Sequence, residues 1–232
     1  MLGTIVNVLA IIAGTLLGLF FKKGIPERSK EITFSAIGLS TILIGLKMGL
    51  KGNNELVMII SLVTGGLIGE AIGIDEHLNA LGEKLYKIAG SKDSTFIQGF
   101  VTASLIYSIG AMATLGPLEA GLNGNYQILF VKSTLDGITS IILASTFGIG
   151  VICSVLPVFV YQGLITVFAG SLEGVLTEAV VTYLSSTGGI LIVAIGVNML
   201  LKRDIKVANL LPALVVSVLV TIFAASYFPN FL

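Results

Sequence analysis

The chain has 232 residues, of which 55% are hydrophobic and 11% are charged, and its mean hydropathy is +1.01. A soluble domain carries roughly 25% charged residues, so this composition excludes an ordinary soluble domain and indicates a membrane protein. The 13 basic and 13 acidic residues cancel, which argues against nucleic acid as a partner. The single cysteine, Cys153, excludes an internal disulfide and a multi-cysteine metal site.

Apolar stretches of about 20 residues, enough to cross a hydrocarbon core of about 30 Å, recur along the chain. We therefore predict an all-α polytopic bundle of eight transmembrane helices. Their approximate limits are residues 3–21, 32–50, 56–74, 96–115, 127–147, 151–170, 179–200 and 208–228. No basic residue precedes the first span, and Lys22 and Lys23 follow it. We therefore expect a retained helix rather than a cleaved signal.

Basic residues gather in alternate connections of this topology. The connections after the first, third and seventh spans hold Lys22, Lys23, Arg28, Lys30, Lys84, Lys87, Lys92, Lys202, Arg203 and Lys206. The connection after the second span holds only Lys51. Because basic loops stay on the cytoplasmic side, we expect a multi-pass membrane protein with both termini outside the cytoplasm.

The uncharged segment 147–151 is the weakest span boundary. Joining residues 126–170 into one broken element would move Lys202, Arg203 and Lys206 to the outer side. The charge pattern therefore favours two spans here and eight in total.

Residues 35–51 and 186–202 share seven residues in step: Ser35/Ser186, Gly38/Gly189, Ile44/Ile195, Gly45/Gly196, Met48/Met199, Leu50/Leu201 and Lys51/Lys202. These copies lie in the second and seventh spans, and an odd offset of five spans inverts one copy relative to the other. We predict a single membrane domain, 1–232, with a first repeat at 1–74 and an inverted second repeat at 151–232. Between them lie a cytoplasmic surface helix at 75–94 and central helices at 95–150. A chance match between glycine-rich apolar helices is the alternative.

Small residues recur at four-residue steps in the first three spans: Ala10, Gly14, Gly18, Thr41, Gly45, Gly49, Gly65, Gly69 and Gly73. Small faces let helix backbones approach closely in lipid, so we interpret these series as packing surfaces. The segment 75–94 instead alternates leucines with charges, which is typical of a helix lying on the membrane surface. We expect His77 on its solvated face.

The fifth span carries a pair of opposite charges, Lys132 and Asp136, four residues apart and so on one helix face. Ser133, Thr139 and Ser140 extend this polar stripe. A charge at the midplane costs about 2.5–3.5 kcal/mol on insertion scales, so such a residue faces water or a partner. The pair either lines a solute pathway or forms a structural ion pair.

The fourth span offers a matching polar face of Ser104, Tyr107 and Ser108. After it, the glycines and the proline of LGPLEAGLNGN predict a break in the helix, with Glu119 either at an outer mouth or as a plain loop carboxylate. In the first span, Asn7 either bonds across helices or contacts a solute. In the sixth, Gln162 marks a span end or lines a cavity.

Three segments carry a family resemblance: the opening GTIVNVLAIIAGTLLG, the central IGAMATLGPLEAGLNGNYQILFVKSTLDGITSIILASTFGIGV and the later YQGLITVFAG. They resemble the YdfK/YqgA family of bacterial membrane proteins, whose function is unknown. The resemblance implies a multi-span inner-membrane protein and little about chemistry. The family's Lys-Ser-x-Leu-Asp-Gly segment is matched by Lys132, Ser133, Leu135, Asp136 and Gly137.

These features favour a small-solute or ion transporter or channel. The alternative is a membrane-embedded structural or regulatory protein that acts through a partner. We expect no enzymatic activity, since the spans carry no nucleophile with a histidine base and no metal motif, and we expect no cofactor. The expected partners are the lipid bilayer and an unidentified small solute or ion. Eight short helices enclose little volume, which favours a homodimer.

Overall fold

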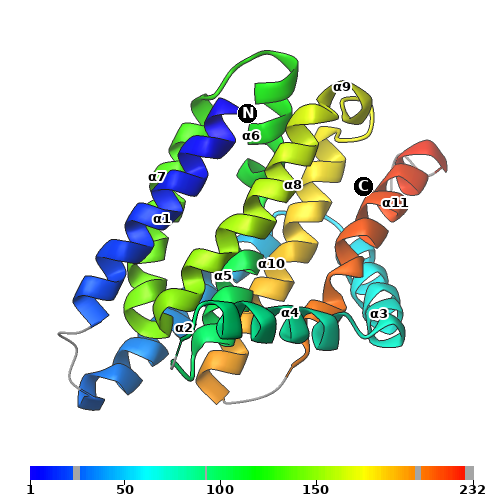
Figure 1. The fold of residues 1–232 in the computed structure, drawn as a ribbon. Helices are drawn as coiled ribbons and strands as arrows, with labels where there is room; N and C mark the ends of the chain where they lie inside the picture. Colours follow the sequence, from blue (N-terminus) through cyan, green and yellow to red (C-terminus); the bar gives the residue numbers. More distant parts are fainter. Residues whose placement is uncertain (23–26, 92, 202–204, 228–232) are drawn as a thin grey trace. The chain divides into compact units, whose positions relative to one another are not determined.

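The computed structural model describes residues 1–22, 27–91, 93–201 and 205–227 (Figure 1). In this part of the chain every regular element is a helix, as expected for an all-α fold. The α-helices are α1 (Leu2–Lys22), α2 (Glu27–Gly49), α3 (Glu55–Ile72), α4 (Ile74–Ile88), α5 (Phe96–Ser108), α6 (Ala111–Leu122), α7 (Gln127–Phe147), α8 (Val155–Val167), α9 (Ala169–Leu172), α10 (Glu178–Leu201) and α11 (Pro212–Tyr227). Two 3-10 helices, η1 (Gly148–Ser154) and η2 (Val207–Leu210), precede α8 and α11.

Five described helical segments are long and apolar enough to cross a membrane: Leu2–Phe21, Glu55–Ile72, Gln127–Val167, Glu178–Leu201 and Val207–Tyr227. A sixth is added when α5 and α6, which meet at a bend of 59°, are taken as one span. Helix α2 contributes a shorter apolar stretch, Phe34–Gly49. The prediction of a polytopic helical membrane protein is confirmed at this level. The predicted end of the last span at 228 and the basic residues Lys202 and Arg203 lie outside the described residues.

The helices pack into two units that interleave along the chain. Unit 1 comprises Met1–Ile37, Asn79–Ser108 and Met112–Gly170, and unit 2 comprises Gly38–Leu78, Ile109–Ala111 and Ser171–Leu232. Unit 1 thus holds α1, α5, most of α6, α7 and α8, while unit 2 holds the end of α2 with α3, α10 and α11.

In unit 1, α1 and α7 lie side by side and run in the same direction (Figure 1). A methyl group on Gly3 would lie 2.6 Å from the Leu129 side chain, and one on Gly18 would collide with the Ile141 carbonyl. The chain then turns back through η1, because Gly163 of α8 lies beside Met1 of α1. The segment Gln127–Val167 therefore contains two antiparallel helices rather than one long rod.

Helices α5 and α6 both run antiparallel to α7, although the chain bends between them. Tyr107 of α5 contacts Ser140, and Gly116 of α6 contacts Leu129. The bend lies at Gly110, whose φ of +124° is a conformation that strains residues with a side chain. The segment LGPLEAGLNGN was predicted to break the helix, but α6 continues through Pro117 and ends only at Leu122, near the end of that segment. Glycine conformation, rather than proline, interrupts this helix.

In unit 2, the two copies of the sequence repeat pack against each other as the antiparallel pair α2 and α10. A methyl group on Gly45 would lie 2.6 Å from the Gly189 carbonyl oxygen and 2.8 Å from Val193 Cγ2. At the equivalent position, a methyl group on Gly196 would lie 2.8 Å from the Gly38 carbonyl oxygen and 2.6 Å from Ile42 Cγ1. The contacts are reciprocal, because Gly38 and Ile42, which Gly196 meets, are the repeat counterparts of Gly189 and Val193, which Gly45 meets.

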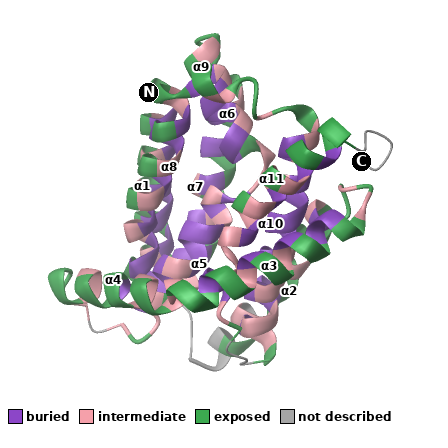
Figure 2. Cartoon of the chain, turned by 90° about the vertical axis from the view of Figure 1, so that its right-hand side faces the viewer, coloured by how far each residue is buried: buried purple, intermediate pink, exposed green. Residues whose placement is uncertain are grey.

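Helices α3 and α11 form a second close antiparallel pair in unit 2. Gly65 lies against Ala213, and Gly69 lies against the carbonyl of Asn209. Figure 2 shows that α10 is largely buried, whereas α4 is mostly exposed. The small-residue faces predicted in the first three spans are therefore packing surfaces.

Candidate functional site

The candidate site lies where α1 and α7 approach most closely in unit 1. Gly14 faces the backbone carbonyl of Gly137, and a side chain at Gly14 would collide with that carbonyl. Ala10 lies on the other side of Gly137. Because small residues meet on both helices, the two backbones come close enough for short polar side chains to bond across the interface.

Lys132, Asp136 and Asn7 form a buried hydrogen-bonded cluster at this interface. Lys132 Nζ donates to Asp136 Oδ2 at 2.7 Å, and Asn7 Nδ2 donates to the same oxygen at 3.0 Å. The three residues are 5%, 7% and 0% exposed, respectively. The predicted helical pair thus exists, and a residue 129 positions away completes it. Asn7 therefore bonds across helices, as one of its two interpretations expected, and its contact with a solute stays a prediction.

The polar residues of α5 divide into two groups. Tyr107 shares a hydrogen bond of 2.7 Å with Ser140 of α7, so the predicted faces of these two helices do meet. Ser104 instead donates to the Phe100 carbonyl at 2.6 Å. Ser108 is half-buried and ends the helix just before the bend at Gly110.

Three other predicted site residues bond locally rather than to the charged pair. Ser133 and Thr139 donate to the carbonyls of Leu129 and Leu135, at 2.7 and 2.8 Å. Glu119 lies in α6 and accepts a hydrogen bond from Asn123 at 2.9 Å. The cluster itself therefore consists of Lys132, Asp136 and Asn7. Ser133, Thr139 and Glu119 instead form hydrogen bonds within their own helices or to the next turn of chain.

The interior of unit 1 also holds polar groups that lack hydrogen-bond partners. Gln162 is fully buried with neither amide atom paired, and Thr4 and Thr15 are fully buried with unpaired hydroxyls. The side-chain carbonyl oxygen of Asn7 (Oδ1) is likewise buried and unpaired. An unpaired buried polar group costs about 1–3 kcal/mol, and such groups are commonly satisfied by buried water. The amide of Gln162 in an apolar span was the signal visible in the sequence, whereas the threonines gave none.

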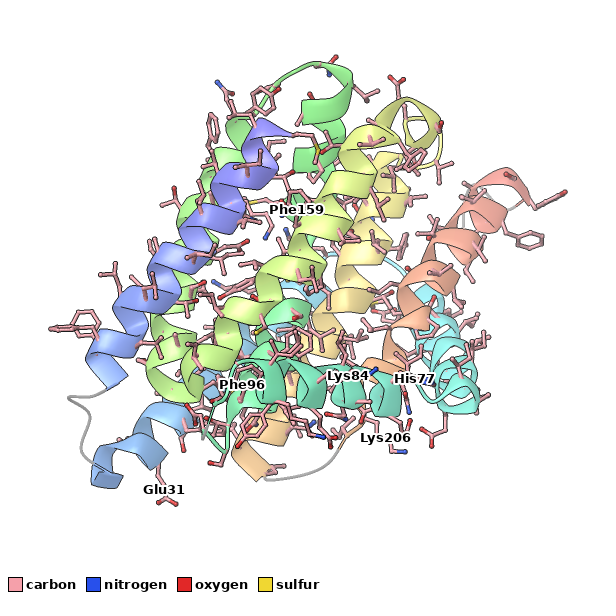
Figure 3. All side chains as sticks on the ribbon, in the orientation of Figure 1. Glu31, His77, Lys84, Phe96, Phe159 and Lys206 are labelled. Carbon is pink, nitrogen blue, oxygen red and sulfur yellow. The ribbon has the colours of Figure 1, made fainter. Side chains whose placement is uncertain are left out.

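A second polar cluster joins the end of α3 to the segment before α11 in unit 2. Lys206 Nζ lies 2.8 Å from Glu76 and 3.3 Å from Glu70, and Asn209 Nδ2 donates to Glu70 at 2.6 Å (Figure 3). The hydrogen bond from Lys206 lowers the pKa of Glu76, and the two carboxylates raise the pKa of Lys206 to about 12. His77 lies beside this cluster, exposed, and its Nδ1 bonds to the Gly73 carbonyl. In the described part of the chain, no three His, Cys, Asp or Glu side chains gather as a metal site requires.

Apolar helices of spanning length around a buried ion pair define a polytopic helical membrane protein. The chain belongs to the family described as "Protein of unknown function (DUF554)", whose model matches residues 2–222. This membership bears out the resemblance seen in the sequence.

Two relatives cover nearly the whole chain. The first is YdfK of Bacillus subtilis (strain 168), described as an uncharacterized membrane protein, which is 37% identical over 220 residues and 93% of each chain. The second is YqgA of Escherichia coli (strain K12), described as an uncharacterized protein, which is 28% identical over 221 residues, 93% of this chain and 94% of that one. No solved structure matches the chain significantly.

Proposed function

We propose that the protein is a small-solute or ion transporter or channel of the bacterial inner membrane, with its polar route in the interior of unit 1. The observation that carries this proposal is the buried Lys132–Asp136 pair, 2.7 Å apart, with Asn7 as its third member. Ionised side chains within spanning helices are costly and mark solute pathways more often than they add stability. The unpaired polar groups of unit 1 favour a hydrated interior over a structural ion pair in a tightly packed, water-free interface.

The arrangement of the helices supports an inverted repeat. Reciprocal contacts at Gly38/Gly196 and Gly45/Gly189 are what a pseudo-twofold axis between α2 and α10 would produce. The proposed repeat partners also share units, with α1 and α8 in unit 1 and the end of α2 from Gly38, α3, α10 and α11 in unit 2. Such repeats are common in transporters, where they place the solute site near the midplane.

A topology of eight spans agrees with the relative directions in which the packed helices run. Counting α5 with α6 as one broken span, and α7 and α8 as two, makes α1 and α7 parallel, and α2 and α10 antiparallel. The contacts of Gly14 with Gly137 and of Gly45 with Gly189 have these directions. Basic connections then face the cytoplasm, with both termini outside.

Flux through purified protein in liposomes tests the transport function. We expect the wild type to release at least one small solute or ion along its gradient, and Asp136→Asn to reduce that rate at least tenfold. Glu173→Gln, which neutralises an exposed carboxylate, is the matched control and should leave the rate unchanged. Absence of flux for every solute and ion offered, with no cellular effect of Asp136→Asn, would refute the proposal.

The alternative function is a structural or regulatory role through a partner protein, and one observation favours it. Helix α4 leaves Leu81 and Ile88 exposed, at 40% and 83%, although a membrane surface would cover the same residues. In a deletion strain, this alternative predicts that Leu81→Ser with Ile88→Ser abolishes complementation while Asp136→Asn complements normally. The transport function predicts the reverse.

A further inference from the structure

The fully buried amide of Gln162 points into the interior of unit 1. On α8, the preceding residue, Tyr161, shares a hydrogen bond of 3.0 Å with Thr114 of α6, and the following residue, Gly163, lies beside Met1 of α1. Leu164, which is 53% exposed, lies about 160° around the helix from Gln162. Gln162 therefore projects between α1 and α6, away from the exposed face of α8.

Thr4 projects into the same interior from α1. Gly3 and Gly14 face α7, and Met1 faces α8, so these residues define two sides of α1. At 100° per residue, Thr4 falls between those two directions. Its hydroxyl is fully buried and has no partner.

The contacts of Leu129 indicate how far along the helix axes the Gln162 amide and the Thr4 hydroxyl lie from the charged pair. Leu129 of α7 contacts Gly3 of α1 and Gly116 of α6, and Met1, two residues before Gly3, contacts Gly163, the residue after Gln162. Lys132 follows Leu129 by three residues, which is about 4.5 Å along the helix axis. Thr4 and Gln162 thus lie about one helical turn from the charged pair, to which Asn7 is itself bonded.

The charges of the interior indicate what kind of molecule it accepts. Lys132 and Asp136 are the buried charged residues of the described chain, and they neutralise each other. The buried groups of unit 1 that have no partner are uncharged, and they include the Gln162 amide, the Thr4 hydroxyl and the side-chain carbonyl oxygen (Oδ1) of Asn7. An ion would lose its hydration here without gaining an unpaired counter-charge, which is costly. An uncharged molecule would not bear this cost.

We propose that Gln162, Thr4 and the Asn7 carbonyl oxygen bind a small uncharged solute that both donates and accepts hydrogen bonds. This inference rests on the transport function proposed above and names its substrate class. The Gln162 carbonyl accepts from the solute and its amino group donates to it, so the solute satisfies both ends of an amide that the protein leaves unpaired.

Stopped-flow light scattering of proteoliposomes, with glycerol and urea as permeant probes, tests this site. We expect the wild type to admit at least one probe, and Gln162→Leu to reduce its entry at least tenfold. Thr187→Val is the matched control, because it removes a fully buried, unpaired hydroxyl in unit 2 and should leave entry unchanged. The thermal midpoint of Gln162→Leu in detergent should equal or exceed that of the wild type, since the substitution removes an unpaired buried amide.

Five outcomes would overturn the site, and the first four separate it from the transport function. Flux of K⁺, Na⁺ or Cl⁻ with no entry of glycerol or urea would refute the uncharged substrate while leaving transport intact. Osmotic water flow without solute entry would do the same. Wild-type entry through Gln162→Leu, or a loss of entry that parallels a lowered thermal midpoint, would remove Gln162 from the site. No flux of any kind would refute both proposals together.

Discussion

Lys132 and Asp136 illustrate how a buried charge depends on its partner. Lys132→Met leaves the Asp136 carboxylate buried with only the Asn7 amide as a donor, so we expect a loss of about 3–5 kcal/mol in unfolding free energy. Lys132→Met combined with Asp136→Leu should recover most of that loss, because neither charge then remains. Unfolding in detergent followed by circular dichroism measures both variants.

The double variant also separates the two interpretations of the pair. A structural ion pair predicts that the double variant, once stable, complements a deletion strain as well as wild type. A solute pathway predicts that complementation stays absent despite the recovered stability. If the single variant Lys132→Met were as stable as wild type, the pair would contribute nothing measurable to stability, which would contradict the structural ion pair.

The Lys206 cluster predicts a dependence of stability on pH. The pKa of Glu76 is lowered from its ordinary value of 4.5, so its contribution is present above pH 4.5 and is lost as pH falls through the lowered pKa. The pKa of Lys206 is raised from 10.5 to about 12, so its contribution is full below pH 10.5 and is lost as pH rises through about 12. Between these limits the contribution should be constant.

Lys206→Met provides the measurement. The thermal midpoint of the wild type should exceed that of the variant by a small amount at pH 6–9, because the cluster is exposed and screened by solvent. The difference should shrink below pH 4.5 and in high salt. A difference that persisted at low pH and high salt would show that the methylene stem of Lys206 stabilises the protein, rather than its charge.

The residues of the site differed in how far the sequence predicted them. The pairing of Lys132 with Asp136 followed from helical spacing alone, since residues four apart share a face. The contact of Asn7 with Asp136 joins helices 129 positions apart and depends on the close approach of Gly14 to Gly137. Ser104, Ser133 and Thr139 looked alike in the sequence, yet each bonds to its own helix, an option open to any serine or threonine.

At the scale of elements, the pair α2 and α10 predicts equal sensitivity at repeat-related glycines. Gly45→Ala and Gly196→Ala each add a methyl group within 2.6 Å of the partner helix. Overpacking of this kind costs about 1–3 kcal/mol, so both variants should lose similar amounts of stability. Gly170→Ala, which meets nothing within 4 Å, is the control.

The same unfolding assay in detergent measures all three variants. A large loss at Gly45 with none at Gly196 would contradict the pseudo-twofold relation between the two helices. Similar losses at both would support it, because reciprocal contacts are the distinguishing property of a twofold interface.

Helix boundaries were predicted well where hydrophobic length determines them and poorly where backbone conformation does. The limits of the first, fifth and seventh spans agree with α1, α7 and α10 to within a few residues. A break was expected after the fourth span, in LGPLEAGLNGN, but the chain bends at Gly110, and α6 continues through Pro117 to Leu122. A proline can continue in a helix when neighbours satisfy the freed carbonyl, whereas a positive φ ends the helix at once.

At the scale of the whole molecule, the division into two units separates two roles. Unit 2 joins helices from both ends of the chain through glycine contacts and keeps its charged cluster exposed. Unit 1 combines α1 and α8 with the central helices and buries the ion pair. The unrepeated middle of the chain thus supplies the ion pair, while α1 and α8 of the proposed repeats supply Asn7, Thr4 and Gln162 to the same unit.

The orientation and the span count predict which positions face each side of the membrane. With Cys153→Ser as background, single cysteines at Asn53 and Gly124 should react with a membrane-impermeant maleimide in intact cells. Cysteines at His77 and Lys87 should react only after the cells are permeabilised. All four positions are exposed, so accessibility depends on the side of the membrane rather than on burial.

The pair of positions 53 and 124 tests the broken span most directly. They lie on the same side only if α5 and α6 together cross the membrane, because α3 crosses once between 53 and 77. A re-entrant loop formed by α5 and α6 would place Gly124 on the side of His77. Labelling at 53 without labelling at 124 would therefore contradict eight spans, and labelling at 77 but not at 53 would invert the orientation expected from the basic connections.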